Sequence, residues 1–161
     1  MLQRITVGVG DLAVSNRPET EIVTFSLGSC LGVVIHDPVA KVAGMLHLML
    51  PESKLNPQRA EKQPGVFADT GLPRLFRSAY ELGANKKHMR VVLVGGGQVM
   101  DEAGRFNIGK RNYTAVRKIL WRNNVLVDVE DVGGSVNRTV GIEVETGRVW
   151  LKTNTKEIKT L

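Results

Sequence analysis

Two residues in the first third of the chain have the chemistry of a nucleophile and a base. Cys30 is the only cysteine in the sequence and follows a glycine and a serine in the stretch TFSLGSC. His47 interrupts the apolar run AGMLHLMLP, where burial of a titratable ring costs free energy unless a partner hydrogen-bonds to it. A thiol is mostly protonated near neutral pH, and a neighbouring imidazole makes the reactive thiolate available. The two side chains are therefore a candidate cysteine and histidine pair.

The residues between Cys30 and His47 predict a β-hairpin that would bring the two side chains together. Two apolar runs flank Asp37-Pro38, a favourable start for a tight turn because proline presets its own φ. If two residues separate Asp37 from Ala40, Cys30 pairs with His47 and both side chains point to the same face of the sheet. A three-residue loop would shift the pairing by one and place them on opposite faces. The predicted pairing therefore depends on the turn.

The turn before the thiol also offers groups that covalent catalysis needs. Its flexible glycine and free backbone amides, at Gly28 and Ser29, could receive the oxyanion of a tetrahedral intermediate, together with the amide of Cys30. Thr24 lies six residues before Cys30 on the incoming strand and could orient the histidine through its hydroxyl or its backbone carbonyl. In the alternative interpretation, Cys30 is a small buried residue without reactivity, as many lone cysteines are. The residues alone leave both interpretations open.

The sequence pattern also predicts the strands and helices that must position these residues. Helical spacing of apolar residues predicts one helix that ends at Gly83 and a second over about 110–123. Alternation and β-branched residues predict strands at 3–9, 20–27, 89–97 and 125–134, and hairpins at 30–50 and 138–153. With strands at both ends and two main helices between them, we predict a single α+β domain over residues 1–161. Its expected form is a layered α/β sandwich with mixed or antiparallel sheets.

Composition and charge narrow the range of partners. The formal net charge is +6, but the basic residues are spread along the chain, so the charge favours an acidic partner only weakly. The polar segment 51–65 contains three prolines and is predicted to be a loop, long enough to act as a lid or a partner contact. The N-terminus lacks the apolar core of a signal peptide, and no segment is long enough to span a bilayer. We therefore expect a cytoplasmic protein without membrane insertion.

Sequence patterns also argue against nucleic acid, nucleotide and metal binding. Arg111, Lys118 and Arg122 share one side of the second helix, yet aromatic residues make up only 5% of the chain and form no stacking motif. Residues 104–111 approach the spacing of a phosphate-binding loop, but arginine stands where that loop needs a hydroxyl. His36 and His88 are predicted to be exposed and have no metal-ligand spacing. We expect no nucleic acid partner, no metal and no organic cofactor.

Six stretches of the sequence resemble, in order and spacing, the chemoreceptor glutamine deamidase family CheD of bacterial chemotaxis. They are VGVGDLAVS, TFSLGSCLGVVIHDP, GMLHLMLP, FADTGLP, IGKRN and EDVGG, and they span nearly the whole chain. The cysteine turn and the HLMLP that follows it are the most specific of these.

The resemblance implies a cysteine hydrolase that converts particular glutamine side chains of methyl-accepting chemotaxis receptors to glutamate. It maps the family's catalytic cysteine, histidine and threonine onto Cys30, His47 and Thr24. It also implies a layered fold similar to the catalytic domain of the cytotoxic necrotizing factor toxins, and a possible CheC-type phosphatase partner. The competing hypothesis is a non-catalytic binding module, which docks on receptors or on such a phosphatase through its basic face and residues 51–65, with Cys30 only packed.

Overall fold

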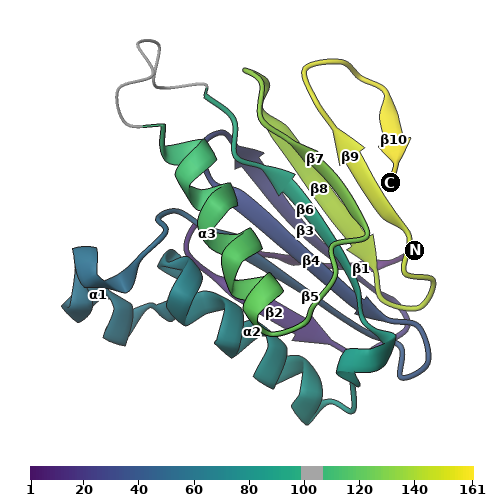
Figure 1. Ribbon diagram of the computed structural model, residues 1–161. Helices are drawn as coiled ribbons and strands as arrows, with labels where there is room; N and C mark the ends of the chain where they lie inside the picture. The colour runs from purple at the N-terminus through teal and green to yellow at the C-terminus, as the bar shows by residue number, and fades with distance from the viewer. Residues whose placement is uncertain (99–106) are drawn as a thin grey trace.

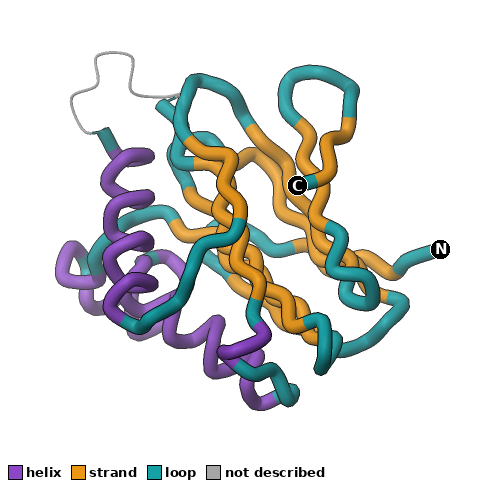
Figure 2. Tube along the Cα trace, turned by 45° about the vertical axis from the view of Figure 1, so that its right-hand side comes forward, coloured by secondary structure: helices purple, strands orange, loops and turns teal. Residues whose placement is uncertain are grey.

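The computed structural model describes residues 1–98 and 107–161, which form three stacked layers (Figure 1). One five-stranded sheet, here called the outer sheet, has the order β1 (Gln3–Thr6), β3 (Thr20–Leu27), β8 (Arg138–Glu143), β9 (Val149–Lys152), β10 (Ile158–Thr160) within this part of the chain. The second, the central sheet, has the order β2 (Leu12–Ser15), β5 (Val42–Leu48), β4 (Leu31–Asp37), β6 (Arg90–Gly95), β7 (Val129–Val132). The helices lie on one side of the strands (Figure 2).

Strands β4 and β5 are buried at every position because the central sheet is covered on both faces. One face packs against helices α2 (Ala68–Glu81) and α3 (Ile108–Arg122), and that core includes Leu31, Val33 and Leu46. The opposite face packs against the outer sheet, and that core includes Val34 and Met45. Alternate residues of one strand thus enter two different cores. The predicted layered α/β sandwich with mixed sheets and two main helices is confirmed.

The hairpin between β4 and β5 forms, but the predicted two-residue turn is wrong. Asp37 pairs with Val42, so four residues, 38–41, make the connection. The Asp37 carboxylate, which is buried, accepts hydrogen bonds from the N–H groups of Val39 and Ala40, and the Asp37 carbonyl accepts one from Lys41 N at 2.8 Å. This wider loop, with Lys41 at a φ of 56°, shifts the pairing by two residues from the prediction. A shift of two keeps every side chain on its predicted face.

The ends of the chain differ more from the sequence prediction. The strand expected at 3–9 ends at Thr6, and a separate strand, β2, crosses to the central sheet. The expected loop at 51–65 contains three short helices, η1 (Ser53–Leu55), α1 (Pro57–Lys62) and η2 (Pro64–Val66). A further 3-10 turn, η3 (Lys86–His88), precedes β6. The predicted helix that ends near Gly83 is confirmed, with that glycine at a φ of 101°.

His36 was expected to be exposed, and this prediction is wrong. Its side chain is only 4% exposed, because β4 is covered on both faces. The ring donates through Nε2–H to the carbonyl of Val144 at 2.8 Å, since a carbonyl oxygen can only accept. His36 therefore joins the central sheet to the outer sheet and is a structural residue.

Candidate functional site

The thiol of Cys30 lies in a short turn, residues 28–30, between β3 and β4. The residue is partly buried, and its side chain packs against the core between the two sheets. Burial raises the pKa of the Cys30 thiol, while the backbone N–H of the same residue lowers it by less. The thiol is therefore protonated at neutral pH, and a base is needed to activate it.

All three carbonyls of this turn accept hydrogen bonds. The Gly28 carbonyl accepts from Gly97 N at 2.8 Å, and the Cys30 carbonyl accepts from Gly96 N at 2.8 Å. The Ser29 carbonyl accepts from the side-chain amide of Asn112 at 3.0 Å. Within the part of the chain that the structure describes, the backbone N–H of Ser29 donates to no carbonyl. The turn is thus held through its carbonyls, and the Ser29 amide keeps a donor for another group.

His47 has no exposed surface and is hydrogen-bonded to Thr24 across the two sheets. The hydroxyl oxygen of Thr24 lies 2.7 Å from His47 Nδ1 and also 2.7 Å from the carbonyl oxygen of Val7. A threonine hydroxyl has one hydrogen, and a carbonyl can only accept, so Thr24 donates to Val7. It must then accept from Nδ1–H of the imidazole, which assigns the proton of the neutral ring to Nδ1. Nε2 is left with a free lone pair.

The second ring nitrogen of His47 has the properties of a base that lacks a proton. Nε2 is buried and has no hydrogen-bond partner among residues 1–98 and 107–161. Burial lowers the pKa of His47 to about 4, and the Asp11 carboxylate opposes that effect only in part. At neutral pH the imidazole is therefore uncharged, with Nε2 available as an acceptor.

The sheet register brings Cys30 to the same face as His47, in a diagonal position. His47 pairs with Gly32, and Cys30 precedes Gly32 by two residues. The prediction that Cys30 pairs directly with His47 is therefore wrong by two residues, because of the four-residue loop. The prediction that both side chains share a face agrees with the packing of Cys30 between the sheets. A Cβ at Gly32, opposite His47, would lie 3.1 Å from the Leu27 side chain, so a larger residue there would require Leu27 to shift.

Asn112 on α3 belongs to this neighbourhood, and sequence reasoning did not find it. It is fully buried, and its Nδ2 donates to the carbonyls of Ser29 at 3.0 Å and Met49 at 2.9 Å. One signal could have revealed it: Asn112, Val116 and Leu120 recur every fourth residue along the buried stripe of α3. An amide in an apolar stripe needs partners, as His47 does in its apolar run.

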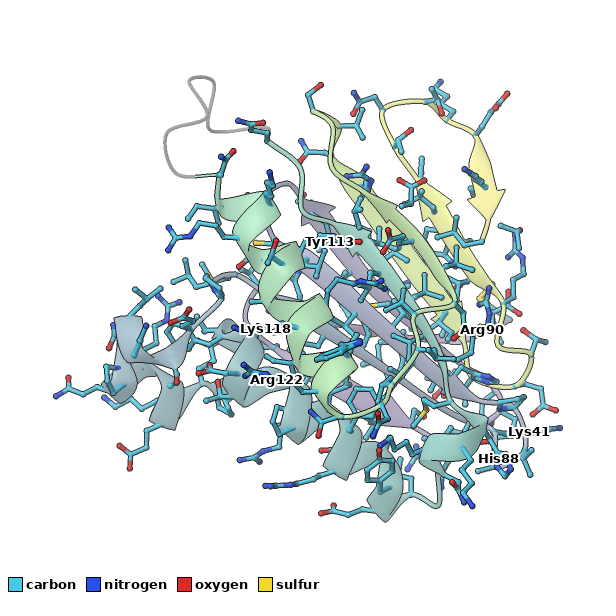
Figure 3. All side chains as sticks on the ribbon, viewed as in Figure 1. Lys41, His88, Arg90, Tyr113, Lys118 and Arg122 are labelled. Atoms are coloured by element: carbon cyan, nitrogen blue, oxygen red, sulfur yellow. The ribbon has the colours of Figure 1, made fainter. Side chains whose placement is uncertain are left out.

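The other motifs that the sequence offered form no metal or nucleotide site within residues 1–98 and 107–161. Among the described residues, no cluster of three or more His, Cys, Asp or Glu side chains could hold a metal ion. Of the segment that approached a phosphate-binding loop, residues 104–106 lie outside the described residues. Lys118 and Arg122 lie along α3 on exposed positions, and Tyr113 on the same helix reaches Glu130 of β7 at 2.9 Å (Figure 3). No described helix is both long and apolar enough to cross a bilayer.

Comparison with known proteins assigns the family. The family model for CheD, described as chemotactic sensory transduction, matches residues 49–153. A probable chemoreceptor glutamine deamidase CheD 1 of Syntrophus aciditrophicus is 45% identical over 98% of this chain and 98% of its own. The chain belongs to the CheD family. A probable deamidase CheD 2 of Anaeromyxobacter dehalogenans is 50% identical over 90% of this chain and 91% of its own. The chemoreceptor glutamine deamidase CheD of Halalkalibacterium halodurans is 40% identical, covering 92% and 93%.

The match to the CheD family model begins after the candidate site residues Thr24, Cys30 and His47 and includes Asn112. The alignments with the CheD relatives are longer, reaching 98% of the chain. Among solved structures, a Neisseria meningitidis protein of the DUF152 family model has a TM-score of 0.50 at 13% identity, over 83% of this chain and 63% of its own. That likeness concerns the fold alone. The expected similarity to the cytotoxic necrotizing factor catalytic domain stays a prediction.

Proposed function

We propose that the protein is a cysteine-dependent deamidase that converts glutamine side chains of chemotaxis receptors to glutamate in the cytoplasm. Family membership supports the substrate, since the CheD relatives carry the name chemoreceptor glutamine deamidase. The single structural observation that carries the mechanism is the hydrogen bond between Thr24 and His47, which leaves Nε2 of the imidazole unprotonated. Cys30 is the nucleophile, His47 the base, and Thr24 the residue that orients the base.

The first half-reaction forms a thioester and releases ammonia. His47 Nε2 takes the thiol proton as Cys30 Sγ attacks the carboxamide carbon of the receptor glutamine. The carbonyl oxygen becomes an oxyanion, which the backbone N–H groups of Ser29 and Cys30 stabilise beside Gly28. The protonated imidazole then gives its proton to the nitrogen, and the C–N bond breaks. Because burial lowers the pKa of His47 to about 4, this imidazolium is a strong proton donor to the leaving group.

The second half-reaction restores the enzyme. His47, neutral again, takes a proton from water as the water oxygen attacks the thioester carbon. The C–S bond breaks, the thiol regains its proton and glutamate is released. Each event replaces a neutral amide by a carboxylate on the receptor. The same tetrahedral chemistry would also cleave a glutamyl methyl ester, with methanol as the leaving group. The reaction uses the chain's own residues and requires no cofactor.

The thiol and imidazole of this mechanism start as a neutral pair. Burial raises the pKa of Cys30 and lowers that of His47, so both shifts favour the uncharged forms. Proton transfer then accompanies attack, in contrast to sites that hold a preformed thiolate and imidazolium. The exposed basic residues along α3 and the segment 51–65 are the proposed contacts for the receptor or a CheC-type phosphatase.

The test incubates receptor fragments with wild type and with Cys30→Ala, and follows conversion of glutamine to glutamate by mass spectrometry. Wild type should convert specific glutamines and Cys30→Ala none. Alanine suits this position because Cys30 is small and its side chain makes mainly packing contacts. If wild type converts no glutamine, or Cys30→Ala converts as well as wild type, the proposed cysteine mechanism is wrong. The first of these outcomes favours the non-catalytic binding module in which Cys30 is only packed.

A further inference from the structure

The side chain of Asn112 connects the two segments on which the proposed mechanism depends. Its Nδ2 donates to the Ser29 carbonyl, one residue before the nucleophile, and to the Met49 carbonyl, two residues after the base. Ser29 and Met49 precede Asn112 in the sequence by 83 and 63 positions. One buried amide group therefore joins the cysteine turn, the end of β5 and α3.

The orientation of this amide follows from its partners. Both partners are carbonyl oxygens, which only accept, so the NH₂ group must face them and both of its hydrogens are used. Asn112 has no exposed surface, and its Oδ1 is buried without a hydrogen-bond partner in the described part of the chain. An unpaired buried acceptor costs free energy, and the two donated hydrogen bonds offset that cost.

The backbone around Asn112 reinforces the same contact. Gly109, one turn earlier on α3, lies so close to the residues that follow β6 that a Cβ there would clash with the carbonyls of Gly97 and Gly96. Gly96 and Gly97 donate in turn to the carbonyls of Cys30 and Gly28. The first turns of α3 thus hold the cysteine turn directly through Asn112 and indirectly through these two glycines.

We infer that Asn112 is a positioning residue, which sets the separation of the Cys30 thiol and the His47 imidazole by hydrogen-bonding the segments that carry them. This role rests on the proposed function. Cys30 and His47 are diagonal and not directly paired in the sheet register, so strand pairing alone does not bring the two side chains together. The turn that carries Cys30 lies outside β4, and backbone hydrogen bonds from Gly96 and Gly97 hold it to the loop after β6. Among the described residues, no backbone hydrogen bond ties this turn to Met49 at the end of β5. Asn112 supplies that constraint without contact to the reacting atoms.

The experiment compares Asn112→Ala with Val116→Ala as a matched control. Val116 is also fully buried on α3, one turn further along the same stripe, so its truncation weakens the packing of the helix without removing a hydrogen bond to the turn. Asn112→Ser is a second variant, in case Asn112→Ala is too unstable to purify, because one hydroxyl hydrogen can serve one carbonyl only. Thermal unfolding sets the temperature at which all variants are folded.

Two readouts separate positioning from stability. With a receptor fragment as substrate, kcat of Asn112→Ala should fall about 100-fold with KM little changed, since misplacing reacting groups by about 1 Å costs that much. The rate of Cys30 alkylation by iodoacetamide, followed against pH, should shift to lower pH in Asn112→Ala as the released turn exposes the thiol. Val116→Ala should match wild type in both measurements.

The outcomes distinguish this inference from the proposed function. If wild type is active and Asn112→Ala equals Val116→Ala in kcat and alkylation profile, the positioning role is wrong and the deamidase proposal stands. If wild type is inactive, the deamidase proposal fails and the alkylation profile decides alone. A shift in Asn112→Ala but not in Val116→Ala then still supports the constraint on the cysteine turn, and equal profiles overturn it.

Discussion

Lowering the pH from 7.5 to 5 should destabilise the folded protein by about 2 kcal/mol through His47 alone. Burial lowers the pKa of this imidazole to about 4 in the folded protein, against the Asp11 carboxylate, and the ordinary value of 6.5 applies to the unfolded chain. Because the pKa of His47 is lower in the folded protein, the unfolded chain binds the proton at a higher pH than the folded protein does. The stability is complete above about pH 6.5, is lost as the pH falls from there to about 4, and is lost no further below that.

The magnitude follows from the two protonation equilibria. At pH 5, protonation of His47 multiplies the ratio of unfolded to folded protein by about 30. This factor corresponds to a loss of about 2 kcal/mol of unfolding free energy. The range stops at pH 5 because Asp37 contributes its own loss at lower pH. Burial raises the pKa of its carboxyl, but the N–H groups of Ala40, Asn85 and Val39 lower it by more, to below the ordinary value of 3.8.

The assay is urea unfolding of wild type and of His47→Gln at pH 7.5 and pH 5. Glutamine keeps a hydrogen-bonding side chain and removes the titration, while His36 and His88 are common to both proteins and cancel. The loss of unfolding free energy between the two pH values should be about 2 kcal/mol larger in wild type. Equal losses in the two proteins would refute the reasoning, because His47 would then be protonated alike in the folded and unfolded states.

Two further substitutions test neighbouring contacts. Thr24→Val removes the acceptor for His47 Nδ1–H and the donor to the Val7 carbonyl, and should lower the unfolding free energy by about 1–3 kcal/mol. The kcat of Thr24→Val on a receptor fragment should fall by about 100-fold or more, which is the lower range of what a positioned base contributes. Thr24→Ser keeps the hydroxyl and should retain most activity. Equal rates for the two variants would contradict the orienting role. Arg138→Met removes an ion pair with Asp131 at 2.9 Å, in which Arg138 is 5% and Asp131 25% exposed, and a bond to the Gly133 carbonyl. In urea unfolding it should cost about 2 kcal/mol, less than for a fully buried pair, because Asp131 is partly exposed and Lys159 still lies 3.7 Å from it. A loss under about 1 kcal/mol, typical of an exposed pair, would contradict this expectation.

Local patterns predicted much of the fold because they depend on short-range physics. The helical spacing before Gly83 and the paired apolar runs around Asp37 each act over a few residues, and both elements formed. The separate path of β2 was not predictable in this way. Its four residues join the central sheet by pairing with β5, some thirty residues later, and nothing in their own pattern distinguishes that sheet from the outer one.

For the candidate site, the sequence by itself determined the chemistry and the shared face. It identified Cys30 as the one thiol and His47 as a buried ring in need of a partner, and the parity of the hairpin placed both on one side of the sheet. The sequence also proposed Thr24 as the residue that orients His47, but only the tertiary structure shows that contact, and it adds Asn112 as a partner of the cysteine turn. Thr24 reaches His47 only because two sheets stack, and Asn112 reaches the cysteine turn only because α3 packs over its end. These contacts join residues 23 and 83 positions apart, and no local pattern encodes the packing that makes them neighbours.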